Sequence, residues 1–208
     1  MRRVREVLRL RTAVGDVFPK GITHVETLVA LVEDLQSTLP DSVRAILKLL
    51  VDTFTALEVQ ITALDAEITQ RSKSDPTARR LMTIPGIGLI ASTAIIALVP
   101  AAEGFPAGRD FAAWLGLTPL QKSTGGKQKL GAVSKRGERT IRRLLIIGAS
   151  AVVQQASRRG APKGSWLAQM LARKPKMLVT VALANKMARV IWALLVIGGT
   201  YRTPATAA

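Results

Sequence analysis

Two adjacent hydroxyl residues, Ser123 and Thr124, stand directly before a glycine pair and among several cations. A hydroxyl becomes a useful nucleophile when neighbouring groups orient it and stabilise the negative charge that forms during attack. Lysine and arginine suit a phosphodiester as the electrophile, because its transition state gathers negative charge on oxygen. The stretch is therefore a candidate site for attack on a nucleic-acid backbone. The simpler alternative is that both hydroxyls only contact phosphate oxygens.

Glycines and cations on both sides of the hydroxyls complete this candidate site. The string "STGGKQKLG" lacks the spacing of a P-loop, so nucleotide triphosphate binding is not indicated. The glycines give the backbone freedom to approach a ligand closely. The expected nucleic-acid contacts in this region are Lys122, Gly125, Gly126, Lys127, Lys129, Ser134, Lys135, Arg136, Arg139, Arg142 and Arg143.

A second candidate phosphate contact is the stretch "IPGIG", which lies between two apolar segments within residues 79–99. Pro85 would end the first helix, and the two glycines allow a tight turn. A turn of the helix-hairpin-helix type exposes backbone N–H groups at a helix start, where phosphate oxygens bind without base reading. An ordinary helix turn is the alternative. The residues expected to contact DNA are Pro85, Gly86, Ile87 and Gly88.

The charge of the chain is concentrated in its C-terminal part. The formal net charge is +16, and residues 76–208 hold 20 of the 30 Lys and Arg residues with only three acids, Glu103, Asp110 and Glu138. A polyanionic partner would relieve this self-repulsion, and nucleic acid is the first candidate because cationic faces release counterions from phosphates. An anionic membrane surface and a merely solvated basic surface are the alternatives.

Composition also excludes several classes of site. The chain has no cysteine and one histidine, His24, so disulfides, thiol catalysis and histidine relays are excluded. We expect no cofactor and no metal ligands in this chain. The apolar runs at 89–100 and 191–199 are too short to span a membrane. No leader pattern follows the basic start, so we expect a cytoplasmic protein without membrane contact.

The elements that would position the site are helices, so the predicted fold is all-α, with two domains. Residues 1–75 form a helical linker and coiled coil, and residues 76–208 form a compact helical domain that contains the helix-hairpin-helix-like turn. From Val43 to Ile68 apolar residues recur in alternating steps of four and three, which is a heptad seam. Its partner is either the preceding segment, 23–39, folded back as a hairpin, or a second chain.

Three further helices are expected around the candidate site. The stretch 108–119 is a short helix with Phe111, Trp114 and Leu115 facing the core, and 135–156 is a helix that is basic at its start and buried later. Residues 158–165 are a basic linker, 180–199 form the last helix, and the residues after it are a frayed tail. Lys186 and Arg189 on the last helix snorkel at the edge of its packed face or point at nucleic acid.

The ordered set "IPGIG", "FAAWLGLTP", "STGGKQKLGAVSKRGER" and "IRRLLIIGASAV" resembles the C-terminal transposase domain of insertion-sequence family 110, recombinases guided by a structured bridge RNA. The resemblance covers about residues 79–200, and the heptad helix is similar to the linker coiled coil of that family. It implies a serine in this loop that attacks the DNA backbone and forms a covalent protein–DNA link. The family motif places serine directly before the first glycine, where this chain has Thr124, with Ser123 one residue earlier; both stay candidates.

The resemblance also implies partners and a missing part. Double-stranded DNA, a structured guide RNA and a second copy of the chain through the coiled coil are the expected partners. The family carries an N-terminal RuvC-like domain with magnesium-binding acids, and we expect this chain to lack it, so Mg²⁺ is expected only with that domain. The expected function is a transposase. The alternatives are a non-catalytic nucleic-acid-binding remnant that pairs with or inhibits full-length transposase, and a membrane-surface protein.

Overall fold

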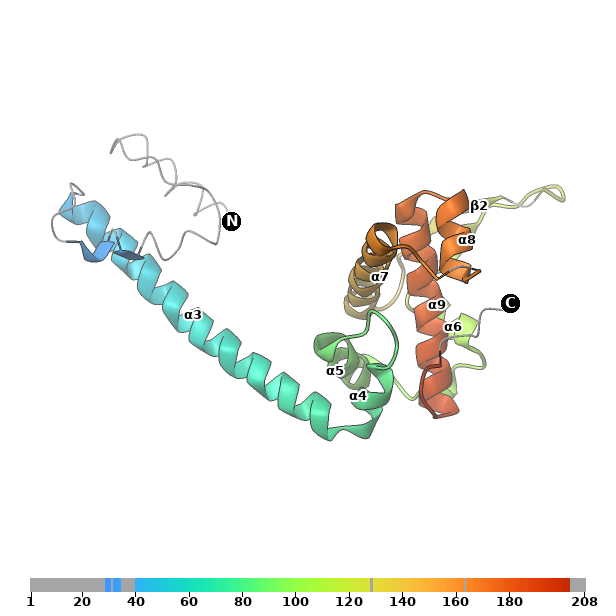
Figure 1. Cartoon of the computed structure of the whole chain (residues 1–208), viewed down its shortest axis with the longest axis horizontal. Coiled ribbons are helices and arrows are strands. Elements are labelled where there is room, and N and C mark those ends of the chain that lie inside the picture. Colours follow the sequence, from blue (N-terminus) through green and yellow to red (C-terminus); the bar gives the residue numbers. More distant parts are fainter. Residues whose placement is uncertain (1–28, 31, 35–39, 128, 163, 203–208) are drawn as a thin grey trace. The chain divides into compact units, whose positions relative to one another are not determined.

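The computed structural model describes residues 29–30, 32–34, 40–127, 129–162 and 164–202. It divides into two compact units, residues 1–65 and residues 66–208. Helix α3 (Asp41–Ser74) begins in the first unit and ends in the second (Figure 1). The described residues are mostly helical, with one small two-stranded sheet, so the predicted all-α class is confirmed.

The first unit contains a small cluster at the start of the heptad seam. Val32, from the segment before α3, is buried together with Leu47 and Val51. The Arg44 side chain fixes this contact because its Nη1 donates to the carbonyls of Val32 at 3.0 Å and Asp34 at 2.6 Å. A preceding segment therefore covers the first turns of the seam, as one alternative predicted. Most of the predicted hairpin segment 23–39 lies outside the described residues.

Later positions of the seam have no such cover in the described structure. The side chains of Phe54, Leu57, Ile61 and Leu64 are 39%, 48%, 56% and 56% exposed. Large apolar side chains that recur every three or four residues on one helix usually pack against a partner. The exposed stretch of seam, Phe54 to Leu64, is therefore a surface without an intrachain partner among the described residues.

The second unit is built around helix α9 (Lys176–Val196), which packs against α7 (Arg139–Arg159), α6 (Gly108–Trp114) and α8 (Trp166–Arg173) (Figure 1). Helices α4 (Pro76–Leu81) and α5 (Leu89–Leu98) complete it, with a short 3₁₀ turn η2 (Ala102–Gly104). The core includes Phe111, Leu115, Leu145 and Ile191, all fully buried. Phe111 and Leu115 thus face the core as predicted, and Trp114 is half-buried against it.

Local signals in the sequence account for the helix ends. Asp75 caps α4 by accepting from Thr77 N–H at 2.6 Å and Ala78 N–H at 3.1 Å, and Pro76 occupies the first helical position. Ser165 caps α8 by accepting from Ala168 N–H. Helix α9 ends before Gly198 and Gly199, whose positive φ angles of 86° and 82° reverse the chain.

Three expectations about elements need correction. The stretch 119–133 contains a β-hairpin where a loop was expected. Helix α8 follows the linker and was not predicted. Thr200–Arg202 do not fray, because the Tyr201 N–H donates to Thr83 Oγ1 at 3.0 Å and fixes the returning chain to the end of α4; residues 203–208 lie outside the described part.

Helix α9 is long and apolar enough to cross a membrane by length and composition. In this structure it is the helix around which the second unit packs, and Val179, Ala184 and Ile191 on it are fully buried. It also carries Lys186 and Arg189. The apolar character of α9 is therefore explained by its place in a protein core.

Candidate nucleic-acid interface and nucleophile

The hydroxyl pair lies at the end of an exposed β-hairpin formed by β1 (Pro119–Gln121) and β2 (Leu130–Val133). Below the tip, Lys122 N–H donates to Lys129 O at 2.8 Å, and Lys127 N–H donates to Thr124 O at 3.1 Å. Gly125 and Gly126 form the turn with φ angles of 57° and 75°, the signs that a type I′ turn requires at both central positions. The glycine pair therefore closes a hairpin, and sequence reasoning missed it although Gly-Gly is a hairpin signal.

The two hydroxyls have different surroundings. Ser123 Oγ accepts from the Lys129 N–H at 3.1 Å and lies 3.5 Å from Gln121 Oε1, at the outer limit of a hydrogen bond. The Thr124 hydroxyl makes no hydrogen bond to any described residue, and both side chains are exposed. An N–H donor beside an oxygen stabilises negative charge on it. The structure thus orients Ser123 and leaves the Thr124 hydroxyl free to rotate.

The root of the hairpin is fixed to the end of α6. Ser134 N–H donates to Thr118 O at 2.9 Å, and Lys135 N–H donates to Gly116 O at 3.1 Å. Lys135 has a φ of 55°, which is uncommon outside glycine and costs about 1 kcal/mol or more. The segments "GLTP" and "SKRG" therefore occur together because they pair with each other at the base of the hairpin.

Glycine is required at the same place. Gly116 and Gly137 have φ angles of 69° and 81°, and a Cβ at either position would overlap with backbone, Arg136 O for Gly116 and Trp114 O for Gly137. Two backbones thus approach closely between α6 and the loop that leads into α7. This contact makes the base of the hairpin rigid while its tip stays exposed.

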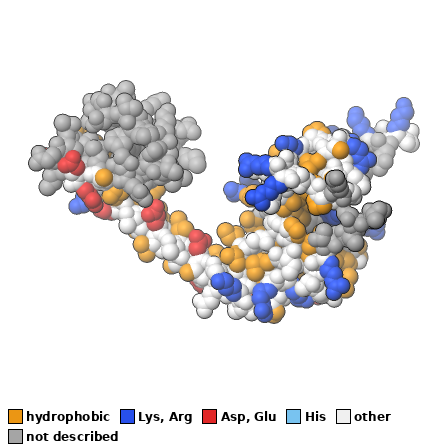
Figure 2. Space-filling model, in the orientation of Figure 1, with side chains coloured by type: hydrophobic (Ala, Val, Ile, Leu, Met, Phe, Trp, Pro, Cys, Tyr) orange, Lys and Arg blue, Asp and Glu red, His pale blue; other side chains and the backbone are white. Residues whose placement is uncertain are grey.

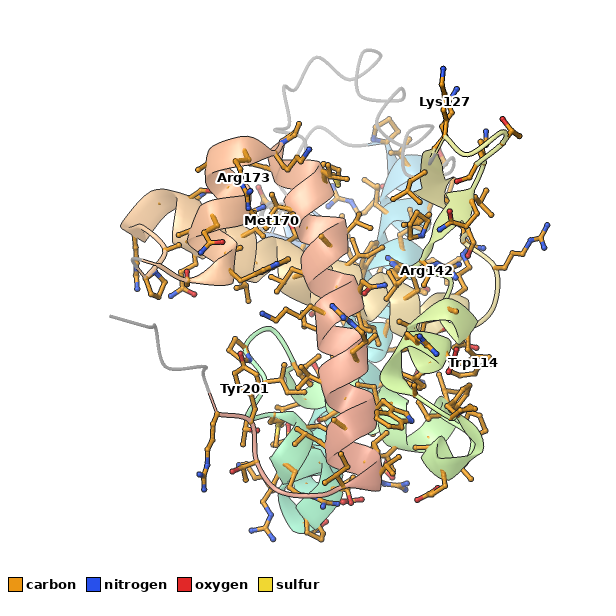
Figure 3. All side chains as sticks on the ribbon, turned by 90° about the vertical axis from the view of Figure 1, so that its right-hand side faces the viewer. Trp114, Lys127, Arg142, Met170, Arg173 and Tyr201 are labelled. Atoms are coloured by element: carbon orange, nitrogen blue, oxygen red, sulfur yellow. The ribbon has the colours of Figure 1, made fainter. Side chains whose placement is uncertain are left out.

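The Arg142 side chain forms hydrogen bonds within the protein. Its Nη1 donates to Leu115 O at 2.9 Å and Arg136 O at 3.1 Å, so the guanidinium joins the end of α6 to the hairpin's returning chain. In Figure 3 Arg142 lies within the body of the unit, whereas Lys127 points away from it at the hairpin tip. Arg142 therefore positions the site and has less capacity to bind phosphate than its neighbours.

The remaining predicted cations are available at the surface. Lys122, Lys127 and Lys129 belong to the hairpin, and Lys135, Arg136, Arg139 and Arg143 belong to its root and the first turns of α7; all seven side chains are exposed. Figure 2 shows Lys and Arg side chains over the second unit and acidic side chains along α3. The hairpin and its root are therefore a cationic surface that surrounds the hydroxyl pair.

The "IPGIG" stretch forms a turn between α4 and α5, as predicted. Gly86 has a φ of 90° and lies against α7, where an added Cβ would come 2.8 Å from Gly148 O. Gly88 is exposed at the start of α5, and a Cβ there would have no described atom within 4 Å. The packing of the turn against α7 thus explains Gly86, whereas Gly88 is exposed. Phosphate binding by this turn stays a prediction.

Helix α7 connects the two predicted contact regions. The Arg142 side chain donates a hydrogen bond to Arg136 O at the hairpin root, and Gly148 packs closely against Gly86 in the turn. These two residues are six positions apart in one helix, about 9 Å along its axis. The hairpin base and the α4–α5 turn are therefore attached to the same helix, on different faces of it.

The acids of the second unit do not fit a magnesium site. Glu138, the lone acid of the basic stretch, caps α7 by accepting from Thr140 N–H at 2.7 Å. No group of three or more His, Asp or Glu side chains that could hold a metal occurs among the described residues.

Comparison with known proteins agrees with the resemblance stated from the motifs. Residues 78–163 match the family described as Transposase IS116/IS110/IS902. The chain is 43% identical over 171 residues to a protein of Pseudomonas aeruginosa named "Probable family 20 transposase", and the match covers 80% of this chain and 51% of the relative. It is 35% identical over 178 residues to the transposase for insertion sequence element IS1328 of Yersinia enterocolitica, covering 86% and 53%.

A further relative is the transposase for insertion sequence element IS1111A of Coxiella burnetii, 36% identical over 138 residues, which are 66% of this chain and 38% of the relative. The chain spans about half the length of the first two curated relatives. The family match begins in α4 and ends after α7, so it contains the α4–α5 turn, α6, the hairpin and its root. With this region, the chain belongs to the IS116/IS110/IS902 family of transposases.

Proposed function

We propose that this chain works in DNA transposition as a site-specific recombinase of an insertion sequence. One observation carries the proposal: a hairpin with a rigid base presents an oriented serine hydroxyl among exposed cations. The names of the relatives support transposition in general. The hairpin adds a defined place where a DNA strand would meet a nucleophile.

In the proposed chemical step, the Ser123 oxygen attacks the phosphorus of a DNA phosphodiester. A bond from Oγ to phosphorus forms, one phosphorus–oxygen bond of the DNA breaks, and the hydroxyl proton ends on the released DNA hydroxyl. Phosphodiester bonds are conserved, so the link can be reversed onto another strand. Lys122, Lys127 and Lys129 would stabilise the negative charge of the transition state.

Ser123 is the better candidate of the pair on geometry. The Lys129 N–H already points at its oxygen, and that donor would favour the charged form of the nucleophile. The position predicted from the family motif is Thr124, which is a bulkier secondary alcohol at the turn. We propose that Ser123 attacks and that Thr124 contacts an adjacent phosphate.

The proposed partners are double-stranded DNA and a structured guide RNA, in the cytoplasm. Both are polyanions, and the second unit has exposed Lys and Arg side chains on the hairpin, at its root and on α7. The proposed contacts of the α4–α5 turn are to phosphate and carry no sequence information.

A second candidate function is favoured by the exposed stretch of seam on α3. An apolar seam of this kind could bind the same helix of another transposase chain. In that case the chain would act as a non-catalytic nucleic-acid-binding subunit that pairs with, and inhibits, the partner.

The binding part of the proposal is tested with DNA and a hairpin variant. Changing Lys127 and Lys129 to Ala should weaken binding of duplex DNA, because each lost phosphate contact lowers the slope of log affinity against log salt by about 0.9. Affinity is measured by fluorescence anisotropy over a range of salt concentrations. The expected loss of slope for the double variant is about 1.8.

The matched control is Lys73→Ala, since Lys73 is an exposed cation on α3 outside the proposed surface. It should leave both affinity and slope unchanged. An equal fall in slope for the control and the hairpin variant would show that the cations act only through net charge, and the assignment of the hairpin would then be wrong.

A further inference from the structure

A shallow hollow of about 390 Å³, largely open to solvent, lies on one face of α9, between that helix and the returning chain after it. It is lined by Lys186, Arg189, Val190, Ala193, Leu194, Thr200, Tyr201 and Arg202. The helical members recur at steps of three and four residues, which places them on one face of α9. In Figure 3 Tyr201 and Trp114 lie on opposite sides of α9. Arg189 lies between the hollow and α6, because its backbone packs against Gly108 at the start of α6.

The chemistry of the lining is an apolar floor with cations around it. Val190, Ala193 and Leu194 supply aliphatic surface, and Tyr201 supplies a half-buried aromatic ring that packs against the main core. Lys186, Arg189 and Arg202 supply positive charge, and no carboxylate is among the lining residues. A flat apolar ligand that carries negative charge fits this combination.

The positions of the aromatic ring and one cation are set by contacts outside the hollow. Tyr201 N–H donates to Thr83 Oγ1 at 3.0 Å, and that hydroxyl donates in turn to Arg80 O at 2.6 Å. Lys186 Nζ lies 4.7 Å from the centre of the Trp166 ring on α8. The fold therefore holds Tyr201 and Lys186 in place before any ligand binds.

The hollow also adjoins a proposed phosphate contact. Thr83, which anchors Tyr201, is two residues before Pro85 at the α4–α5 turn. Tyr201, which lines the hollow, is therefore hydrogen-bonded to the segment that leads into this turn. The cations at the hollow extend the proposed nucleic-acid surface to a side that the hairpin does not reach.

We propose that this hollow binds one unpaired nucleotide of a bound nucleic acid, with its base against Tyr201 and its phosphate on Arg189, Lys186 and Arg202. The base must be unpaired because both faces of a paired base are covered by its neighbours in the stack. This inference rests on the proposed function, since it assumes that the chain binds nucleic acid. It adds a base-holding site that is distinct from the hairpin hydroxyls.

The test compares three short DNA duplexes on the whole 208-residue chain. One carries a single unpaired 2-aminopurine, one carries an abasic nucleotide at the same bulge, and one is fully paired. Because stacking on an aromatic side chain stabilises a bound base, we expect the base-containing bulge to bind about tenfold more tightly than the abasic bulge. The 2-aminopurine fluorescence should fall on binding.

Variants of the lining residues test whether the preference for the base-containing bulge comes from this hollow. Tyr201→Ala and Ala193→Phe should each remove the tenfold preference and the fluorescence change, because the first removes the ring and the second fills the hollow. Tyr201→Phe should keep both, since it retains the stacking surface. Lys127→Ala on the hairpin should weaken all three duplexes alike and keep the preference.

The outcomes separate this inference from the proposed function. Equal affinity of the unaltered chain for the base-containing and abasic bulges would overturn the nucleotide site and leave the proposed function standing. No affinity for any of the duplexes would overturn the proposed function itself. The same bulges are also made in RNA duplexes to identify the nucleic acid that supplies the unpaired nucleotide. A larger preference for the base-containing bulge over the abasic bulge in RNA assigns the site to a guide RNA. A larger preference in DNA assigns it to the target DNA.

Discussion

Arg142 and Arg143 are adjacent on α7, yet their side chains have different surroundings. The Arg142 guanidinium donates to the carbonyls of Leu115 and Arg136, whereas the Arg143 side chain is exposed. Both residues fit a basic helix start in the sequence, and both were expected to bind DNA. The sequence could not separate them because one acceptor of Arg142, Leu115 O, lies 27 residues earlier in the chain.

We predict that Arg142→Gln destabilises the fold and that Arg143→Gln does not. Hydrogen bonds from a charged donor contribute about 1.5–3 kcal/mol, and the carbonyls would lose their partner. The thermal midpoint of Arg142→Gln should fall by about 4 °C or more, while Arg143→Gln should unfold like the unaltered chain and bind DNA more weakly. Circular dichroism measures thermal unfolding of both variants. Equal thermal midpoints would contradict the positioning role of Arg142.

Other residue-scale features were accessible from the sequence. The positions of the hydroxyl pair, the cations around it and the buried Phe111 and Leu115 follow from residue type and spacing. The orientation of Ser123 by Lys129 N–H did not, because it depends on which residues face each other across the hairpin. The helix cap formed by Glu138 could not be predicted either, because its assignment depends on α7 beginning at Arg139.

At the scale of elements, the helices of the second unit were largely predictable and the hairpin was not. Apolar periodicity identified the helical stretches, with boundaries displaced by a few residues; α9, for example, begins at Lys176 and not at Thr180. The hairpin strands have three and four residues and no buried side chain, so they are too short and too exposed to show the apolar–polar alternation that marks a half-buried strand. Only Gly125-Gly126 indicated the turn. The pairing of "GLTP" with "SKRG" needed the tertiary structure.

A close contact between elements leads to a prediction for Gly148 in α7. In a helix interior, glycine to alanine ordinarily stabilises by about 1 kcal/mol. Here the new methyl group would overlap with Gly86 O in the α4–α5 turn, so Gly148→Ala should destabilise by about 1–3 kcal/mol instead. Urea unfolding measures the difference in free energy.

The control for that change is Gly104→Ala. Gly104 is exposed, has no φ in the left-handed region and has no described atom within 4 Å of an added Cβ, so its substitution should leave the free energy of unfolding within about 0.5 kcal/mol of the original. A stabilised Gly148→Ala variant would mean that α7 and the turn do not pack closely.

At the scale of the whole molecule, charge and apolar surface separate along the chain. The second unit carries the excess of cations, and α3 carries acids together with an exposed apolar seam. This distribution fits a protein that binds a polyanion with one part and another protein chain with the other. The charge asymmetry was visible in the sequence. The exposure of the later seam was not, because it depends on how far the preceding segment reaches along α3.

We predict that the exposed stretch of seam mediates self-association. Leu57→Asp should reduce the mass of the oligomer to that of one chain, because a carboxylate in an apolar seam stays unpaired and must be desolvated. The control is Leu49→Asp, at a position 68% exposed on the same helix but outside the seam, which should leave the mass unchanged. Sedimentation equilibrium decides the matter. A single-chain mass for the unaltered protein at micromolar concentration would refute the prediction.

The most direct measurement of the central claim is the covalent link between the hairpin and DNA. The chain is incubated with labelled DNA, alone and with a separately expressed N-terminal region of a longer relative. Denaturing gels and peptide mass spectrometry then locate any adduct. We expect an adduct on the peptide that contains Ser123, its loss in Ser123→Ala, and its survival in Thr124→Ala. An adduct that persists in the variant with both residues changed to alanine would show that the hairpin hydroxyls are not the nucleophile.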